Sequence, residues 1–279
     1  MEFKKKDNLK VSLIIPTYKD NAALKLILDS LSYQTYKNFE VIVAEDNNSL
    51  ETRDMLRSYK SSFLIKHYSH QDIGNRKPKA INSAIKISDG EYLIFIDGDT
   101  IPFSTFIKYH VLLSSKNSVL CGRRVNLGDK FSKALRDELI VAKDLENRYL
   151  HYCIALKKDG VRHYEQGISF SPKSIIYKII SIFNKNNNIV ASNFSCFKDD
   201  ILKVNGVDES LPYPPGRDDT DLQWRLEFVG IKMKSCKYSA NLFHLNHSRD
   251  ERELEYQENM KIINKKKENG EFWAKNGVF

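Results

Sequence analysis

Asp97 and Asp99, which flank Gly98, are the acidic pair whose spacing points most directly to chemistry. Residues i and i+2 of an extended segment face the same side, so both carboxylates can act on one ligand. The glycine between them would let that ligand approach the backbone closely. Carboxylate oxygens suit Mg²⁺ or Mn²⁺, which keep further positions for water and phosphate. The sequence therefore predicts a cation site that could neutralise a diphosphate.

Asp46 lies in a second polar run, residues 45–48 (EDNN). Its carboxylate could accept a hydrogen bond from the imide N–H of uracil or from a ribose hydroxyl. A turn held by Asx hydrogen bonds explains either run equally well when each is taken alone. Both runs follow predicted strands, however, and ligands of open parallel sheets bind beyond the carboxyl ends of the strands. We therefore expect Asp46 and the Asp97–Asp99 pair at one edge of a sheet.

A third acidic run, residues 214–222 (PPGRDDTDL), opens a predicted helix. Helix capping and compensation of the helix dipole account for one of its acids, which we take to be Asp221. Four charged residues within positions 217–221 exceed what one cap requires. A carboxylate in this run could act as a general base if its surroundings raise its pKa.

Histidines and basic residues could complete such a site. His244 and His247 are three positions apart, and either could supply a further metal ligand, although a lone histidine is more often structural. Arg76, Lys77 and Lys79 precede a predicted helix. They are either solvated or in contact with phosphate near the helix N-terminus.

The first half of the chain supplies the elements that must position these groups. Predicted strands alternate with amphipathic helices, and this βαβα order implies a mainly parallel sheet with helices on both faces. The strands are 11–15, 40–44, 63–68, 92–96 and 119–121, and the helices are one capped by Asp20, 50–59, one around 81–85, and 103–113.

The second half is more mixed. We predict helices over 129–156 and 219–229 and through most of the last thirty residues. Residues 166–198 contain four lysines and no acid, and within them 174–183 (SIIYKIISIF) is strongly apolar. We expect 166–198 to contact an anionic membrane surface or a lipid-linked acceptor. The alternative is a helix buried against the rest of the protein.

Composition restricts the class of protein. The 279 residues are 41% hydrophobic and 29% charged, as in soluble globular chains. Lys plus Arg is 44 and Asp plus Glu is 36, and the net charge of +8 leaves several anionic partners open. No apolar run approaches the ~20 residues that span a bilayer. The four cysteines are far apart, which excludes a zinc ribbon and favours a reducing compartment, so we expect a cytoplasmic protein.

Several ordered motifs resemble family 2 glycosyltransferases with the GT-A fold. The start of that family is similar to residues 11–18 (VSLIIPTY), 31–43 (LSYQTYKNFEVIV) and 45–49 (EDNNS), and its D-x-D segment is similar to 90–99 (GEYLIFIDGD). Residues 205–209 (NGVDE) and 216–222 (GRDDTDL) resemble the acceptor segment of galactosyltransferase-like and chondroitin-polymerase-like members, and 247–250 (HSRD) resembles a metal-binding histidine segment. Residues 45–48 replace the usual Asp-Asp-Gly-Ser, and Asp218 stands where Glu is common.

The resemblance implies inverting transfer of a sugar, usually from a UDP-sugar, to a hydroxyl of a glycan acceptor in a bacterial surface polysaccharide such as lipopolysaccharide or capsule. It implies that Asp219 deprotonates the acceptor and that Asp99 ligates Mn²⁺ or Mg²⁺ with His247, or alternatively His244. The nucleotide-binding residues would be Pro16, Thr17, Tyr18, Asp46, Arg76, Lys79, Asp97 and Gly98, and the acceptor-binding residues would be Arg217, Asp218 and Trp224.

The implied architecture is one α/β domain with two halves. Residues 1–125 would form a Rossmann-like, doubly wound half that binds the nucleotide sugar. Residues 126–250 would form a mixed acceptor-binding and catalytic half, followed by a helical tail over 251–279.

Two other functions fit parts of the sequence. A haloacid-dehalogenase-type phosphatase would use Asp97 as its nucleophile, but that nucleophile normally ends the first core strand, and three predicted strands precede 92–96. A non-catalytic basic module could bind nucleic acid, but the aromatic residues are not interleaved with Arg and Lys and no nucleic-acid motif is present. We therefore expect no nucleic-acid partner.

Overall fold

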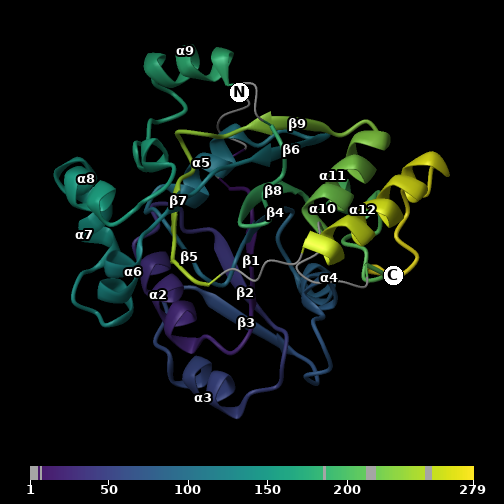
Figure 1. Cartoon of the computed structure of the whole chain (residues 1–279), viewed down its shortest axis with the longest axis horizontal. Coiled ribbons are helices and arrows are strands. Elements are labelled where there is room, and N and C mark those ends of the chain that lie inside the picture. Colours follow the sequence, from purple (N-terminus) through teal and green to yellow (C-terminus); the bar gives the residue numbers. More distant parts are fainter. Residues whose placement is uncertain (1–5, 7, 185–186, 212–217, 249–252) are drawn as a thin grey trace.

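The computed structural model describes residues 6, 8–184, 187–211, 218–248 and 253–279, and of Asp218 it describes the backbone alone. Its largest element is a seven-stranded sheet with the order β3-β2-β1-β4-β8-β6-β9 (Figure 1). β8 is antiparallel to its neighbours β4 and β6, and the other pairs are parallel. The strands are β1 (Val11–Thr17), β2 (Phe39–Glu45), β3 (Leu64–Ser69), β4 (Tyr92–Ile96), β6 (Ser118–Cys121), β8 (Asn193–Phe197) and β9 (Lys232–Ser235).

The alternation of side chains along the central strands explains why helices cover both faces of this sheet. All seven residues of β1 are buried. Leu13 and Ile15 belong to one apolar cluster, which includes residues of α2 (Asn21–Ser32) and α5 (Phe106–Leu113). Ile14 belongs to a second cluster, which includes residues of α4 (Lys77–Ile87) and α11 (Asp218–Phe228). The predicted α/β class with a mainly parallel, doubly wound sheet is thus confirmed.

A second, three-stranded sheet has the order β5-β10-β7, and the sequence did not predict it. Its strands are β5 (Thr100–Pro102), β7 (Val125–Asn126) and β10 (Leu242–His244). β10 is antiparallel to β5, with His244 opposite Thr100, and parallel to β7. This pairing brings residues near 244 beside the turn that follows β4.

The single helix predicted over 129–156 is wrong. The structure has three helices there, α6 (Asp129–Arg136), α7 (Ala142–Asn147) and α8 (Tyr149–Lys158). Glu138 adopts a left-handed conformation with φ of 57°, and the N–H groups of Leu139 and Ile140 both bond back to the carbonyl of Ala134. A left-handed residue ends a right-handed helix, so the chain turns after α6.

The C-terminal helix is also shorter than predicted. α12 covers Glu253–Glu268, and Gly270 has a φ of 66° just beyond it. The remaining residues turn back onto the body, where the N–H groups of Val278 and Phe279 donate to the backbone and side-chain oxygens of Asn205. The other helices are α3 (Leu50–Ser58), the 3₁₀ turn η1 (Tyr164–Gly167), α9 (Ile175–Phe183) and α10 (Lys198–Leu202).

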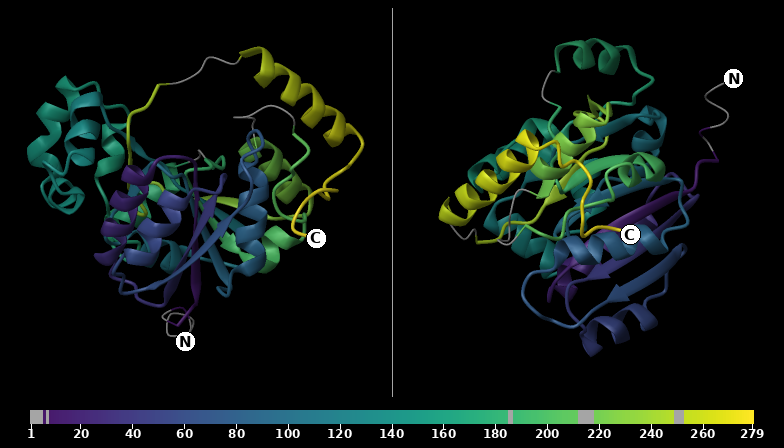
Figure 2. Two further views of the ribbon diagram at one scale, coloured as in Figure 1. Left: turned by 90° about the horizontal axis from the view of Figure 1, so that it is seen from below. Right: turned by 90° about the vertical axis from the view of Figure 1, so that its right-hand side faces the viewer.

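Three helical parts lie outside the central layers. α7 and α8 lie at one side of the molecule and α12 at the other, as both Figure 1 and the left view of Figure 2 show. α9 stands away from the sheet in Figure 1 and in the right view of Figure 2. Among the described residues, no helix is both long enough and apolar enough to cross a bilayer.

Candidate active site

Asp97 lies directly after β4 and contacts two basic side chains. The Lys77 ammonium on the first turn of α4 is 2.6 Å from Asp97 Oδ1, and the Arg124 guanidinium is 3.8 Å from Oδ2. Burial favours the neutral acid, but the charges of Lys77 and Arg124 outweigh it and hold the pKa of Asp97 below its usual range. Asp97 is therefore an ionised carboxylate within a small group of cations.

The structure explains the glycine at position 98 by a close backbone contact, which differs from the expected role in ligand binding. A Cβ atom built on Gly98 would lie 2.5 Å from the carbonyl oxygen of Pro16. The glycine therefore lets the turn after β4 approach the end of β1, rather than leaving room for a ligand. This contact fixes the acidic turn against the neighbouring strand.

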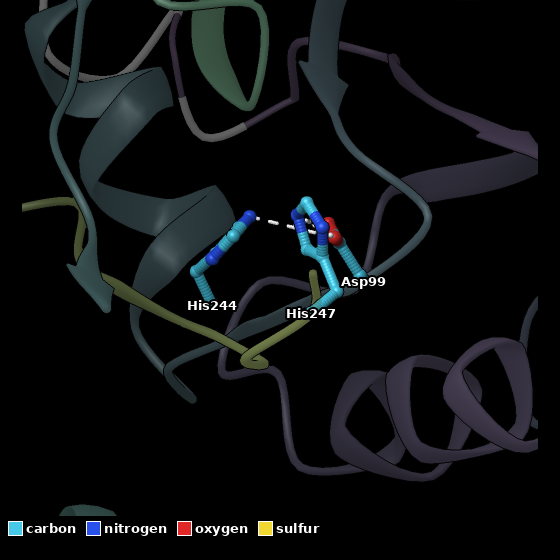
Figure 3. A group of neighbouring side chains, drawn as sticks. All are labelled: Asp99, His244 and His247. Atoms are coloured by element: carbon cyan, nitrogen blue, oxygen red, sulfur yellow. Dashed lines mark ion pairs between the residues drawn. The ribbon is translucent and has the colours of Figure 1, made fainter. Parts of the chain in front are cut away.

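Asp99 lies beside both candidate histidines, as Figure 3 shows. Nε2 of His244 and Nε2 of His247 are each 3.4 Å from Asp99 Oδ2. His244 is buried at the end of β10, whereas 47% of the His247 side chain is exposed. Burial and the neighbouring Asp97 charge raise the pKa of Asp99 to about 6. The structure thus brings both histidines to one carboxylate at the same distance.

These three side chains fit a divalent cation. Their ligand atoms lie within 4.8 Å of one another. Nδ1 of His247 is 2.7 Å from the Ser248 carbonyl, which can only accept, so Nδ1 carries a proton and Nε2 is the ring atom that could bind a cation. Asp99 Oδ1 is buried and has no hydrogen-bond partner among the described residues. Two imidazole nitrogens and a carboxylate form a donor set that holds first-row divalent metals.

Asp46 lies just after β2 and is 6% exposed. Its carboxylate accepts hydrogen bonds from the Arg76 backbone N–H, at 2.9 and 3.1 Å, and lies 2.8 Å from Nε2 of His70. Its own N–H donates to the Thr17 carbonyl at 2.9 Å. Asp46 therefore ties the end of β2 to the end of β1 and to the start of α4.

The remaining predicted nucleotide contacts surround Asp46. Pro16 and Thr17 are buried at the end of β1, and Tyr18 is 52% exposed just beyond it. Arg76 caps α4 through its backbone, and Lys79 is half-buried in the first turn of the same helix. The edge of the sheet where β1, β2 and β4 end thus carries most of the predicted nucleotide site.

Asp219 lies on the first turn of α11 and lines a pocket with Pro16, Lys77 and Ala191. Its Oδ1 accepts a hydrogen bond from the Thr220 backbone N–H at 2.7 Å. Since Lys77 also contacts Asp97, the pocket joins the acidic turn after β4 to the start of α11. Arg217 and the side chain of Asp218 lie outside the described residues.

Asp221 is not a simple helix cap. It is fully buried and accepts from Arg225 Nε at 2.7 Å and from the indole N–H of Trp224 at 3.0 Å. Arg225 in turn donates to the carbonyls of Val204 and Gly206, both at 2.9 Å. Trp224 is 7% exposed, so the structure places this predicted acceptor contact among buried groups and not beside Asp219 in the pocket.

Sequence reasoning gave no role to two residues of this site and considered a third only in outline. Lys77 was noted with Arg76 and Lys79, but only the structure shows that it contacts Asp97. Arg124 follows β6, which runs in the same direction as β4, so the rule used for Asp46 and Asp97 would have indicated it. His70 directly follows β3, which is parallel to β2, so the same rule would have indicated it as well.

Comparisons with known proteins identify the family and the fold. Residues 12–180, more than half of the chain, match the family described as glycosyl transferase family 2. A UDP-Glc:alpha-D-GlcNAc-diphosphoundecaprenol beta-1,3-glucosyltransferase of Escherichia coli, WfgD, is 26% identical over 69% of this chain and 77% of its own length. A validoxylamine A glucosyltransferase of Streptomyces hygroscopicus subsp. limoneus is 36% identical over 31% of this chain. The matched part spans about a fifth (20%) of the length of that relative.

Solved structures share the fold at low sequence identity. S. aureus TarS in complex with UDP-GlcNAc has a TM-score of 0.59 at 15% identity, over 91% of this chain and 65% of that one. A mannosyltransferase from Pyrobaculum calidifontis in complex with GDP-Man and Mn²⁺ has a TM-score of 0.56 at 13% identity, over 87% of this chain and 58% of that one.

The fold is therefore the expected GT-A fold, and the phosphatase and the non-catalytic binding module lose their support. The galactosyltransferase-like subtype finds no match among these relatives, two of which are glucosyltransferases by name. The chain belongs to glycosyl transferase family 2.

Proposed function

We propose that this glycosyltransferase moves a hexose from a UDP-sugar to a hydroxyl of a glycan acceptor during synthesis of a bacterial surface polysaccharide. One observation carries the proposal: a single pocket joins the end of β1, Lys77 and Asp219. It therefore connects residues expected to bind the donor with the residue expected to act on the acceptor. The name of the relative WfgD, which covers 69% of this chain, supports a UDP-sugar donor and an acceptor linked to a lipid diphosphate.

The donor would bind at the edge formed by β1, β2 and β4. Asp46 can accept a hydrogen bond from the uracil imide, and its present contacts with His70 and Arg76 hold the carboxylate in a fixed orientation. Asp97 can contact ribose or sugar hydroxyls. Lys77 would stay close to Asp97 and meet the developing negative charge of the leaving diphosphate.

Asp99, His244 and His247 would hold Mn²⁺ or Mg²⁺ at the diphosphate. When bound, such a cation stabilises negative charge on a departing phosphate. The residues of this chain position it, since β5 and β10 hold the carboxylate and both imidazoles at one point. The Pyrobaculum mannosyltransferase, whose structure contains Mn²⁺ together with GDP-Man, supports this part of the proposal.

Asp219 would take the proton of the acceptor hydroxyl while that oxygen attacks the anomeric carbon. The bond from that carbon to the diphosphate oxygen breaks as the new glycosidic bond forms, and UDP leaves with the electron pair. Attack from the face opposite the leaving group inverts the configuration. The protein contributes mainly by holding both substrates in line and excluding water.

The first test is a screen of UDP-sugars for Mn²⁺-dependent UDP release. Slow hydrolysis can replace transfer when no acceptor is present, so the donor can be found before the acceptor. We expect one UDP-sugar to give release that stops when Mn²⁺ is chelated. Release of phosphate from simple phosphomonoesters without any response to UDP would contradict the proposal.

The second test is the substitution Asp219→Asn, which removes the base and keeps the shape. We expect the transfer rate to fall by about a hundredfold to ten-thousandfold, since a positioned base contributes that much. UDP binding, measured by calorimetry, should not change. Asp199→Asn is the matched control, because Asp199 is an exposed acid in the first turn of α10. Wild-type transfer by the Asp219→Asn enzyme would remove Asp219 from this role.

A further inference from the structure

α9 presents an apolar face to solvent that nothing in the described part of the chain covers. Five of its large apolar side chains are between 53% and 77% exposed, and Tyr177 is its only buried residue. The exposed residues are Ile175, Ile176, Ile179, Ile182 and Phe183. The alternative that this run packs against the body of the protein is therefore wrong for these five residues, whereas Tyr177 is buried and Ile180 is partly buried.

The exposed side chains form one continuous stripe. At 100° per residue, Ile175, Ile179 and Ile182 lie along one side of the helix, with Ile176 and Phe183 next to them. Tyr177 lies on the opposite side and is buried to 4% exposure, so it attaches the helix to the body. The stripe consequently points away from the protein.

Contacts at both ends hold α9 in this orientation. Before the helix, Ser169 Oγ donates to the Ser239 carbonyl at 2.7 Å and the Phe170 N–H donates to the Tyr238 carbonyl at 2.7 Å. After it, the Asn184 side chain donates to Ser235 Oγ at 2.8 Å. The helix is thus attached at both ends to β9 and to the segment that follows it, and it projects from the body in Figure 1.

The charge around the stripe selects its partner. No acidic residue occurs in 166–198, and the lysines Lys173 and Lys178 are exposed at the start and at the flank of the stripe. Bulky apolar side chains on one face, bordered by lysines, are typical of helices that lie in the plane of a lipid interface. A second copy of the chain, paired stripe to stripe about a twofold axis, would bring like charges together.

We propose that α9 docks this protein on the anionic surface of a lipid bilayer, with its apolar stripe inserted among the acyl chains and its lysines at the lipid headgroups. This docking goes beyond the transfer reaction and does not depend on it. One consequence does rest on the proposed function. Between Phe183 and Ala191 the chain leads from α9 to the pocket of Asp219, so docking would place that pocket near acceptors carried by the membrane.

The test is sedimentation of the full chain with vesicles of phosphatidylcholine, with and without phosphatidylglycerol. We expect binding to the anionic vesicles that weakens as salt is added. Replacing Ile175, Ile179 and Ile182 by Ser should weaken binding about tenfold for each residue, equivalent to roughly 1.4 kcal/mol each. Replacing Lys173 and Lys178 by Gln should weaken it about fivefold for each lysine.

The matched control replaces two equally exposed apolar residues elsewhere. Leu150 and Ile154 on α8 are both 71% exposed, and the pair Leu150→Ser and Ile154→Ser should bind vesicles as the wild type does. A second readout is Phe183→Trp, whose emission should shift to shorter wavelength with anionic vesicles and be quenched by brominated lipids. The variant with Ile175→Ser, Ile179→Ser and Ile182→Ser should have the melting temperature of the wild type, because the three altered residues are exposed.

Three results would overturn the proposal. The first is absence of binding to anionic vesicles at low salt, and the second is binding that the triple serine change leaves intact. The third is a wild-type dimer in analytical ultracentrifugation that the triple change dissociates while vesicle binding is absent, which would assign the stripe to a second copy. None of these measurements uses a sugar donor, so they are independent of the test of transfer.

Discussion

The substitution Gly98→Ala tests whether the turn after β4 must touch β1 for the enzyme to work. The added Cβ would lie 2.5 Å from the Pro16 carbonyl oxygen, and ordinary contact begins at 3.4 Å. The turn or the end of β1 must therefore move by about 0.9 Å. Gly98 itself has no left-handed backbone, so this collision is the main effect of the change.

The movement should affect both sides of the candidate site. Asp97 and Asp99 are neighbours of Gly98, and Pro16 lines the pocket that contains Asp219. A displacement of about 1 Å in a reacting geometry costs about a hundredfold in rate. We therefore expect kcat/KM for UDP release to fall about a hundredfold, and stabilisation of the protein by UDP with Mn²⁺ to weaken.

Thermal unfolding with and without UDP and Mn²⁺, together with UDP release, measures both effects. Gly160→Ala is the control, since Gly160 has a φ of 78° and open space around it. That change strains the backbone by about 1 kcal/mol without reaching the site, so it should lower the melting temperature and spare activity. If Gly98→Ala kept wild-type kcat/KM, the contact with Pro16 would have no part in positioning the acidic turn.

Three further predictions concern the ion pair, the buried histidine and the metal ligands. Arg225→Met should destabilise the fold by about 3–5 kcal/mol in urea unfolding, because Asp221 would remain buried without its partner, and the loss should shrink when Asp221→Leu is added. His110 is buried, and burial lowers its pKa to about 3, so the unfolded chain binds more protons below pH 6.5. Stability should then fall by about 1.4 kcal/mol for each pH unit between 6.5 and 3, and His110→Gln should remove this slope, which an unchanged slope would refute. His247→Ala should weaken Mn²⁺ binding at least about tenfold in calorimetry, and unchanged affinity would leave His244 and Asp99 as the ligands.

The sequence predicted that Asp46 and Asp97 lie at one edge of the sheet, because one rule governs their positions. Asp46 and Asp97 both follow parallel strands with buried, strongly apolar sequences, and such strands can be recognised without knowing their partners. Their carboxyl ends must then meet at one edge. The same rule applies to Arg124, since β6 runs in the same direction as β4.

The group of candidate metal ligands could not be derived in the same way. His244 and His247 reach Asp99 because β10 pairs with β5, and each of these strands has only three residues. Strands so short carry too little alternation to be recognised in a sequence. The spacing of His244 and His247 indicated only that either could bind a metal, and the resemblance favoured His247. The structure shows that both rings are equally close to Asp99.

The acids at the start of α11 show a further limit of sequence reasoning. Asp219 and Asp221 carry the same carboxylate group and are two positions apart on one helix, so the sequence alone does not distinguish them. Their roles separate because Arg225, one turn beyond Asp221, is buried with it and extends to the carbonyls of Val204 and Gly206. Asp221 is fully buried, so an acceptor substrate could reach it only by displacing Trp224 and Arg225. Asp221 therefore acts as a support for the segment 204–206, and Asp219, which lines the pocket, is left as the candidate base.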